Sequence, residues 1–170
     1  TINEKAGSMF ITVIGINEDG SLSESPTFSN IFSFLFPSSS KMIVNQKMNH
    51  FNIMATHKKE NMLKWYNNIQ KIGEKSRLGI PITIASDPRH GVSKSPVSSN
   101  TSFFSKWPSA LGLGAIGDSS IVREHANIVR QEYSAIGIKL ALGPMADVST
   151  EPRWIRVNGT FGEDANLNAI

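Results

Sequence analysis

The chain of 170 residues contains no cysteine, and this absence removes several kinds of chemistry at once. Disulfide bonds, zinc sites built on thiolates and catalysis by a thiol nucleophile are all excluded. The same absence leaves the cellular compartment undecided. Charged residues are somewhat scarce, at 18% of the chain, while the apolar fraction of 39% is typical of a globular domain that buries a core.

Long apolar runs are missing as well. No window approaches the roughly 20 apolar residues that a membrane-spanning helix needs. The longest apolar run, residues 31–36, is interrupted by Ser33 and closed by Pro37. No signal peptide is visible, but the chain begins at Thr1 instead of methionine. We therefore expect its natural N-terminus to have been removed or to lie upstream.

The net charge of +3 raises the question of nucleic-acid binding, and its excess is local. Residues 41–77 contain eight Lys or Arg against two Glu, largely on one predicted helix. A solvated helix face explains this pattern, because no nucleic-acid motif is present and aromatic residues do not alternate with basic ones as a stacking surface requires. We expect no nucleic-acid partner.

Strand and helix patterns alternate along the chain, which predicts an α/β fold with a parallel sheet. The expected elements are a capped helix at 1–9, a strand or helix end at 10–16, an irregular excursion at 21–40, a strand at 48–54, a helix at 58–76, a strand at 80–85, a long connection at 86–113, a helix at 118–135, a strand at 138–142, a polar loop at 143–164 and a helix beginning at 163–164. Since the sequence stops in the first turns of that last helix, we expect a fragment of a larger domain.

The first polar loop opens with residues 87–91, Asp-Pro-Arg-His-Gly, directly after a predicted buried strand. Pro88 disfavours helix at Asp87, so the carboxylate is presented at the sheet edge, where α/β folds place their sites. Asp87 either caps its own turn or binds a ligand, and its position favours binding. His90 with Asp147 suggests a metal site, but one histidine without HxH or HExxH spacing is more typical of a hydrogen-bonded structural residue.

The second polar loop carries Arg153 and Arg156 on either side of Trp154. In an extended segment residues three apart point to opposite sides, so one arginine is expected to face a cleft while the other pairs with Glu151 or Asp147. For Asp147 we favour this tethering role over ligand binding. Carboxylates and guanidinium groups suit sugar hydroxyls, and an indole suits the apolar face of a sugar ring.

Three stretches resemble, in the right order, the N-terminal barrel of family 3 glycoside hydrolases of the β-glucosidase type. They are LGIPITIASDPRHG (78–91), FSKWPSALGLGAIGD (104–118) and GPMADVSTEPRWIRVNGTFGED (143–164). The resemblance covers nearly the whole chain and is weakest over residues 11–41. It implies the N-terminal part of a (β/α)8 TIM-type barrel, truncated, with residues 1–170 as a partial domain and residues 21–40 as an irregular insertion.

The resemblance also implies a function. Members of this family are retaining, exo-acting hydrolases that cleave terminal non-reducing β-D-glucosyl residues from β-glucosides or oligosaccharides without a metal or other cofactor, and they are often periplasmic or extracellular. The family's sugar-binding Asp of the Asp-x-x-His-Gly motif matches Asp87. Its sugar-binding Arg, the second in Pro-Arg-Trp-x-Arg, matches Arg156, and Ile155 stands where the family usually has glycine.

The family's catalytic groups are expected outside this chain. Its Asp nucleophile lies further along the barrel than Ile170, and its acid/base usually comes from a later domain or loop. Retaining hydrolysis needs two carboxylates roughly 5 Å apart, so we expect this chain to be inactive alone. Two alternatives stay open, a metal-dependent barrel hydrolase using His90 and Asp147 and a non-catalytic sugar-binding protein. The oligomeric state is not indicated.

Overall fold

A computed structural model describes residues 1–24, 37–91 and 103–170. Its elements are α1 (Ile2–Gly7), β1 (Thr12–Ile14), the π-helical turn η1 (Lys41–Asn45), β2 (His50–Ile53), α3 (Lys59–Glu74), β3 (Thr83–Ser86), α4 (Ala110–Ile116), α5 (Ser119–Ala135), β4 (Ile138–Ala141), the 3₁₀ turn η2 (Val157–Gly159) and α6 (Ala165–Ala169). Within these residues, neighbouring strands pair in parallel in the order β1-β2-β3-β4. The predicted α/β class with a parallel sheet is confirmed.

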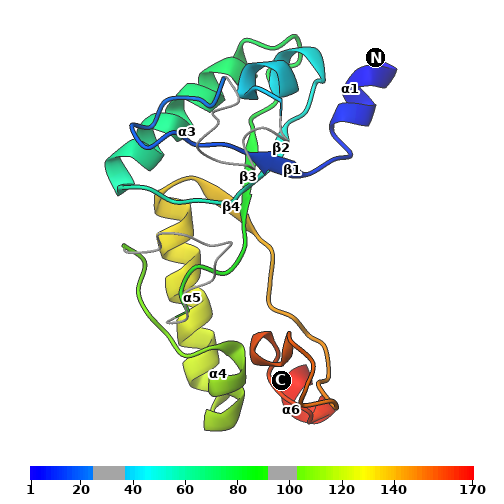
Figure 1. Ribbon diagram of the computed structural model, residues 1–170, viewed down its shortest axis with the longest axis vertical. Coiled ribbons are helices and arrows are strands. Elements are labelled where there is room, and N and C mark those ends of the chain that lie inside the picture. The colour runs from blue at the N-terminus through cyan, green and yellow to red at the C-terminus, as the bar shows by residue number, and fades with distance from the viewer. Residues whose placement is uncertain (25–36, 92–102) are drawn as a thin grey trace.

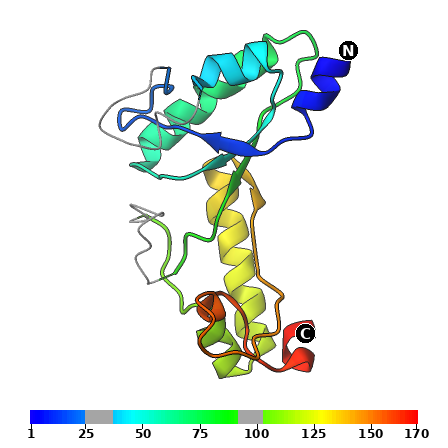
Figure 2. The same ribbon diagram turned by 45° about the vertical axis from the view of Figure 1, so that its right-hand side comes forward.

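The molecule is elongated, with the sheet near one end (Figure 1). Helix α3 and η1 lie by the sheet, and α1 lies at the same end. Helix α5 runs lengthwise away from the sheet toward α4, where the C-terminal segment with α6 also lies (Figures 1 and 2). No helix in the part of the chain that the structure describes is long and apolar enough to cross a membrane.

The core forms between the sheet and α3. Phe51 and Ile53, alternate residues of β2, are fully buried and belong to one cluster with Trp65 and Ile69 of α3. Because side chains alternate along a strand, Asn52 between them points to the other face of the sheet. Each fully buried side chain of this size contributes about 1.5–3 kcal/mol to folding.

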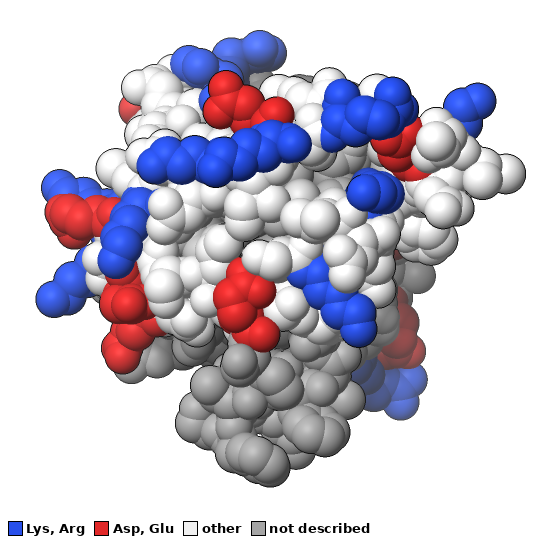
Figure 3. All heavy atoms as spheres, turned by 90° about the horizontal axis from the view of Figure 1, so that it is seen from above, with Lys and Arg blue, Asp and Glu red and all other residues white. Residues whose placement is uncertain are grey.

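The charged surface agrees with a solvated helix face. Figure 3 looks onto the end of the molecule where α1, η1 and α3 lie, and there Lys and Arg side chains are interspersed with Asp and Glu. The basic excess of residues 41–77 therefore gives no continuous basic patch in this view.

Strand β3 begins at Thr83, three residues later than the prediction from Ile80. Pro81 has no N–H to donate to a neighbouring strand. At Ile82 the side chain of Gln70 takes the place of a strand partner: its Oε1 accepts from the Ile82 N–H at 2.9 Å, and its Nε2 donates to the Ile82 carbonyl at 2.7 Å. The apolar run predicted the strand but not this local competition.

Helix α4 lies partly within the predicted connection 86–113, so that prediction is wrong from Ala110 onward. Ser109 caps the helix by accepting a hydrogen bond from the Gly112 N–H. Gly112 and Gly114 lower helix propensity, which is why the sequence indicated a loop. At the N-terminus, by contrast, the capping box at Thr1 and Glu4 is confirmed.

The sequence left open whether residues 10–16 form a strand or the end of a helix. The structure has the strand β1 there. Both ends of the predicted excursion 21–40 lie near the body of the fold. Leu22 forms a bridge with Ile16, and the Ser39 N–H donates to the Ser23 carbonyl at 2.9 Å. The phenylalanines expected to pack back on the body, residues 28, 32, 34 and 36, lie outside the described residues.

Gly114 allows the C-terminal segment to approach α4 closely, since a Cβ there would collide with the carbonyl oxygen of Phe161. We expect Gly114→Ala to lower the free energy of unfolding by about 1–3 kcal/mol, although alanine alone favours a helix. Urea unfolding would measure this loss. At Gly91 an added Cβ meets no atom within 4 Å, so Gly91→Ala should be nearly neutral. Equal midpoints for both variants would contradict the close packing.

Candidate functional site

The two polar loops leave the sheet side by side, at the carboxyl edge of the strands. Strands β3 and β4 are neighbours, and the Leu142 N–H donates to the Ser86 carbonyl at 2.9 Å just past the ladder. A Cβ on Gly143 would lie 3.3 Å from Cγ of Pro88. Both polar loops therefore begin at the same edge of the sheet.

Asp87 is exposed at this edge, and its position is fixed at two points. Its carboxylate Oδ2 accepts a hydrogen bond from Nδ2 of Asn52 on β2, at 3.1 Å. Its carbonyl oxygen accepts from the hydroxyls of Tyr133, at 2.7 Å, and Ser86, at 2.9 Å. Within the described residues the carboxylate caps no backbone N–H of its own turn, so the capping alternative does not describe this residue.

A buried arginine lies beneath the Asp87 loop. Arg89 is 2% exposed, and its Nε donates to Ser86 Oγ at 3.0 Å. Its Nη1 donates to the Met54 carbonyl at 3.0 Å and its Nη2 to the Ile53 carbonyl at 2.7 Å. Burial lowers the pKa of Arg89, while the nearby phenol of Tyr133 and carboxylate of Asp87 oppose that shift. The guanidinium group thus joins the ends of β2 and β3, a role that the motif alone did not reveal.

His90 is a structural residue, as predicted. Its side chain is 3% exposed, and Nε2 lies 2.7 Å from Oε2 of Glu132 on α5. A carboxylate only accepts hydrogen bonds, so we assign the proton to Nε2. The ring centroid lies 4.9 Å from that of Phe104 and 5.1 Å from that of Tyr133. The pair joins the Asp87 loop to α5.

The buried imidazole predicts a loss of stability in acid. Burial lowers the pKa of His90 from 6.5, and the hydrogen bond and charge of Glu132 only partly oppose this, while Lys106 adds to it. Below the ordinary pKa the unfolded chain binds a proton more readily than the folded chain. The free energy of unfolding should therefore fall as pH decreases from about 6.5 through the lower folded-state pKa.

Urea unfolding at about pH 7.5 and pH 5.5 would test this dependence, comparing the native chain with His90→Gln. The variant should be less stable at pH 7.5 but should lose less stability at pH 5.5. Some acid sensitivity should remain, because burial also lowers the pKa of the neighbouring His125. An unchanged difference between the two proteins at both pH values would contradict the assignment.

The arginines of the second loop have different partners. Arg153 pairs with Glu151 through Nε–Oε1 and Nη2–Oε2 contacts of 2.9 and 2.8 Å, which confirms one predicted ion pair. Arg153 lowers the pKa of Glu151 to about 2. Arg156 is exposed, and its Nη2 lies 3.8 Å from the Met145 sulfur. Asp147 makes no hydrogen bond or ion pair in the described part of the chain, so the expectation that it tethers this loop is wrong.

The segment around these arginines is a series of turns, not the extended chain expected from its sequence. The Trp154 N–H donates to the Glu151 carbonyl at 3.0 Å, and the Val157 N–H donates to the Trp154 carbonyl at 3.1 Å. Trp154 is 37% exposed. No hydrogen bond or ion pair joins Asp87 to Arg156 across residues 1–24, 37–91 and 103–170, and their meeting in one subsite stays a prediction.

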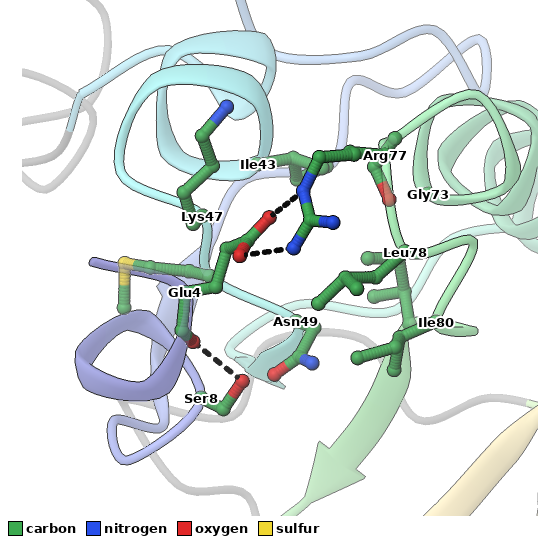
Figure 4. A pocket seen from close by; sticks show the side chains of 12 residues that line it. Glu4, Ser8, Ile43, Lys47, Asn49, Gly73, Arg77, Leu78 and Ile80 are labelled. Atoms are coloured by element: carbon green, nitrogen blue, oxygen red, sulfur yellow. Dashed lines mark hydrogen bonds and ion pairs between the residues drawn. The ribbon is translucent and has the colours of Figure 1, made fainter. Parts of the chain in front are cut away.

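A separate pocket lies at the opposite edge of the sheet. Figure 4 shows Glu4 of α1 facing Arg77, whose Nε and Nη2 donate to the Glu4 carboxylate at 2.8 and 2.6 Å. The hollow of about 50 Å³ is also lined by Asn49 and Ile82, which precede β2 and β3. Arg77 lowers the pKa of Glu4. Side chains at the amino edge of parallel strands usually serve stability, and we exclude this pocket from the candidate site.

The described residues contain no group of three or more His, Asp or Glu side chains that could hold a metal ion. Asp164 accepts hydrogen bonds from the N–H groups of Asn166 and Leu167, which confirms the predicted acidic start of the last helix.

Four side chains that shape the Asp87 loop were not singled out from the sequence: Asn52, Arg89, Glu132 and Tyr133.

The family is decided by comparison with known proteins. Residues 38–169 match the family model described as the glycosyl hydrolase family 3 N-terminal domain. The chain belongs to this family. It is 38% identical to a probable β-glucosidase C of Aspergillus flavus, over 99% of this chain and 26% of that protein. It is 57% identical to a periplasmic β-glucosidase/β-xylosidase of Dickeya chrysanthemi, over 59% of this chain and 16% of that protein.

A solved structure shows the same fold at low sequence identity. The crystal structure of a family 3 glycosyl hydrolase from Mycobacterium smegmatis superposes with a TM-score of 0.67 and 15% identity, covering 99% of this chain and 43% of that chain. This family 3 chain therefore spans about a quarter of the length of the Aspergillus relative and under half of the Mycobacterium structure.

Proposed function

We propose that this family 3 chain is part of a retaining, exo-acting β-glucosidase-type glycoside hydrolase. It would form the N-terminal part of a (β/α)8 barrel and contribute Asp87 and Arg156 to the subsite for the terminal non-reducing sugar. The observation that carries the proposal is Asp87 itself, an exposed carboxylate at the carboxyl edge of the sheet whose orientation is fixed by Asn52. In parallel α/β folds this edge is where substrates bind.

The chemistry of the site suits a sugar. The Asp87 carboxylate accepts hydrogen bonds from hydroxyl groups, while Arg156 only donates and so binds their oxygens. Trp154, partly exposed beside Arg156, can pack against the apolar face of a ring. Charge-assisted hydrogen bonds of this kind are worth about 1.5–3 kcal/mol each.

The relatives support the substrate class and the compartment. Two are named as β-glucosidases, one of which is also a β-xylosidase and is described as periplasmic. We infer a β-glucoside or related oligosaccharide as substrate, and a periplasmic or extracellular location.

In this proposal the chain binds sugar but does not cleave it. Cleavage with retention requires a nucleophile and an acid/base about 5 Å apart, and Asp87 is assigned to sugar binding. Both catalytic carboxylates would come from further along a longer polypeptide, as the lengths of the relatives suggest.

An activity assay tests this division directly. The purified 170-residue chain should release no aryl alcohol from an aryl β-glucoside above the buffer rate, while the longer polypeptide turns the same substrate over. Turnover by the chain alone would contradict the proposal.

A further inference from the structure

Asn52 faces the candidate site from the neighbouring strand. It pairs in register with Ala85 of β3, two residues before Asp87. Phe51 and Ile53 on either side of it are fully buried in the core, so the alternation of β2 directs Asn52 to the opposite face. Its Nδ2 reaches Asp87 Oδ2 at 3.1 Å. This hydrogen bond joins β2 to the loop that follows β3, the neighbouring strand.

The orientation of the Asn52 amide is set by chemistry. An ionised carboxylate only accepts hydrogen bonds, so Asn52 has to present its NH₂ group to Asp87. Its Oδ1 then points away and is buried without a hydrogen-bond partner in the part of the chain that the structure describes. Such a buried, unsatisfied acceptor is unfavourable and calls for an explanation. The contact with Asp87 supplies one.

Strand pairing does not need this bond, because β2 and β3 are already joined through four residue pairs from His50–Thr83 to Ile53–Ser86. The backbone of Asp87 is likewise held by Tyr133 and Ser86 without any help from Asn52. What Asn52 alone controls is the rotation of an exposed carboxylate. A side chain that is ordered before its ligand arrives loses less conformational entropy on binding.

We propose that Asn52 is a positioning residue for the sugar-binding carboxylate. It holds Oδ2 of Asp87, so that Oδ1, which has no partner in the described residues, faces the hydroxyl group of the terminal sugar. The inference rests on the proposed function, and adds a residue to its site. The short carboxamide of Asn52 reaches Asp87 from the neighbouring strand, while Asp87 itself remains exposed.

The isosteric variant Asn52→Asp provides the sharpest test in the complete enzyme. It replaces the donor with a second carboxylate about 3 Å from the first, and two such groups cannot both be ionised at low cost. At about pH 7 we expect KM for an aryl β-glucoside to rise at least about tenfold. As pH falls, the pair shares a proton, the hydrogen bond re-forms and KM should return toward the native value.

Asn67→Asp is the matched control. It makes the same change in charge at an exposed position of α3, outside the site, and its KM should follow the native enzyme at every pH. Asn52→Ala removes the donor without adding a charge, so its KM should rise by a similar factor, but without recovery in acid. A purely structural role for Asn52 would not give a KM that recovers in acid for the aspartate variant only.

The possible outcomes distinguish a failure of the Asn52 role from a failure of the proposed sugar-binding function. If Asp87→Asn raises KM while Asn52→Asp behaves like the native enzyme at about pH 7, the role of Asn52 is refuted and the proposed sugar site stands. If Asp87→Asn has no effect, the proposed function fails, and the inference fails with it. Should Asn52→Asp not fold, Asn52→Ala decides, and a native KM in that variant would refute the role.

Discussion

Replacing Asp87 with asparagine should lower kcat/KM for β-glucosides by about 100-fold or more in the complete enzyme. The amide keeps the size of the side chain but loses the charge that strengthens its hydrogen bonds to sugar hydroxyls. Losing two charge-assisted bonds costs roughly 3 kcal/mol or more, which corresponds to that factor. Steady-state kinetics with an aryl β-glucoside would measure it.

Asp147→Asn is the matched comparison for this prediction. Asp147 is an exposed carboxylate on the adjacent polar loop and makes no hydrogen bond or ion pair with the described residues. Its amide variant should stay within a few-fold of the native kcat/KM. The opposite ranking, with Asp147→Asn the more damaging, would show that the wrong carboxylate has been assigned to the sugar.

Replacing Arg89 with methionine should cause the largest loss of stability. The change removes the donor from the buried Ile53 carbonyl and Ser86 hydroxyl and from the partly buried Met54 carbonyl. Unsatisfied buried groups cost about 1–3 kcal/mol each, partly offset here because a buried charge is also removed. We expect a net loss of about 3 kcal/mol, or roughly 6–12 °C in Tm for a chain of this size.

Thermal unfolding of two further variants makes this prediction specific. Arg89→Lys keeps the charge but cannot reach three acceptors with one ammonium group, so its Tm should lie between those of the native chain and the methionine variant. Arg153→Met removes an arginine that is 89% exposed on its side chain and should change stability by about 0.5 kcal/mol or less. An Arg89→Met variant as stable as the native chain would show that burying the charge costs more than its bonds contribute.

The spacing of apolar residues was enough to predict the helices α3 and α5, the strands β2 and β4 and their parallel arrangement. Burial against a common core imposes a different spacing of apolar residues on a helix and on a strand. The predicted cap at Thr1 marks the start of α1, and the helix predicted from residue 118 begins one residue later, where Asp118 caps α5. Helix α4 was missed, because Gly112 and Gly114 lower the local helix propensity, while Gly114 serves close packing against Phe161. Packing between segments far apart in sequence does not appear in a local pattern.

The residues of the candidate site could likewise be predicted from the sequence only in part. Asp87 could be predicted, because its proline and its place after an apolar run present it at the sheet edge. Asn52, Glu132 and Tyr133 could not, since their importance comes from contacts across 35 to 46 residues of chain. For the second polar loop, the sequence predicted that one arginine forms an ion pair. It did not predict the turns, which depend on backbone hydrogen bonds between neighbouring residues.

The claim that this chain binds sugar without supplying a catalytic carboxylate is tested most directly by covalent trapping. A 2-deoxy-2-fluoro-β-glucoside with a good leaving group traps the nucleophile of a retaining enzyme as a glycosyl ester. In the complete enzyme, peptide mapping should find the label on a carboxylate outside residues 1–170, formed more slowly when Asp87 is changed to asparagine. A label on Asp87 or Asp147 would contradict the account.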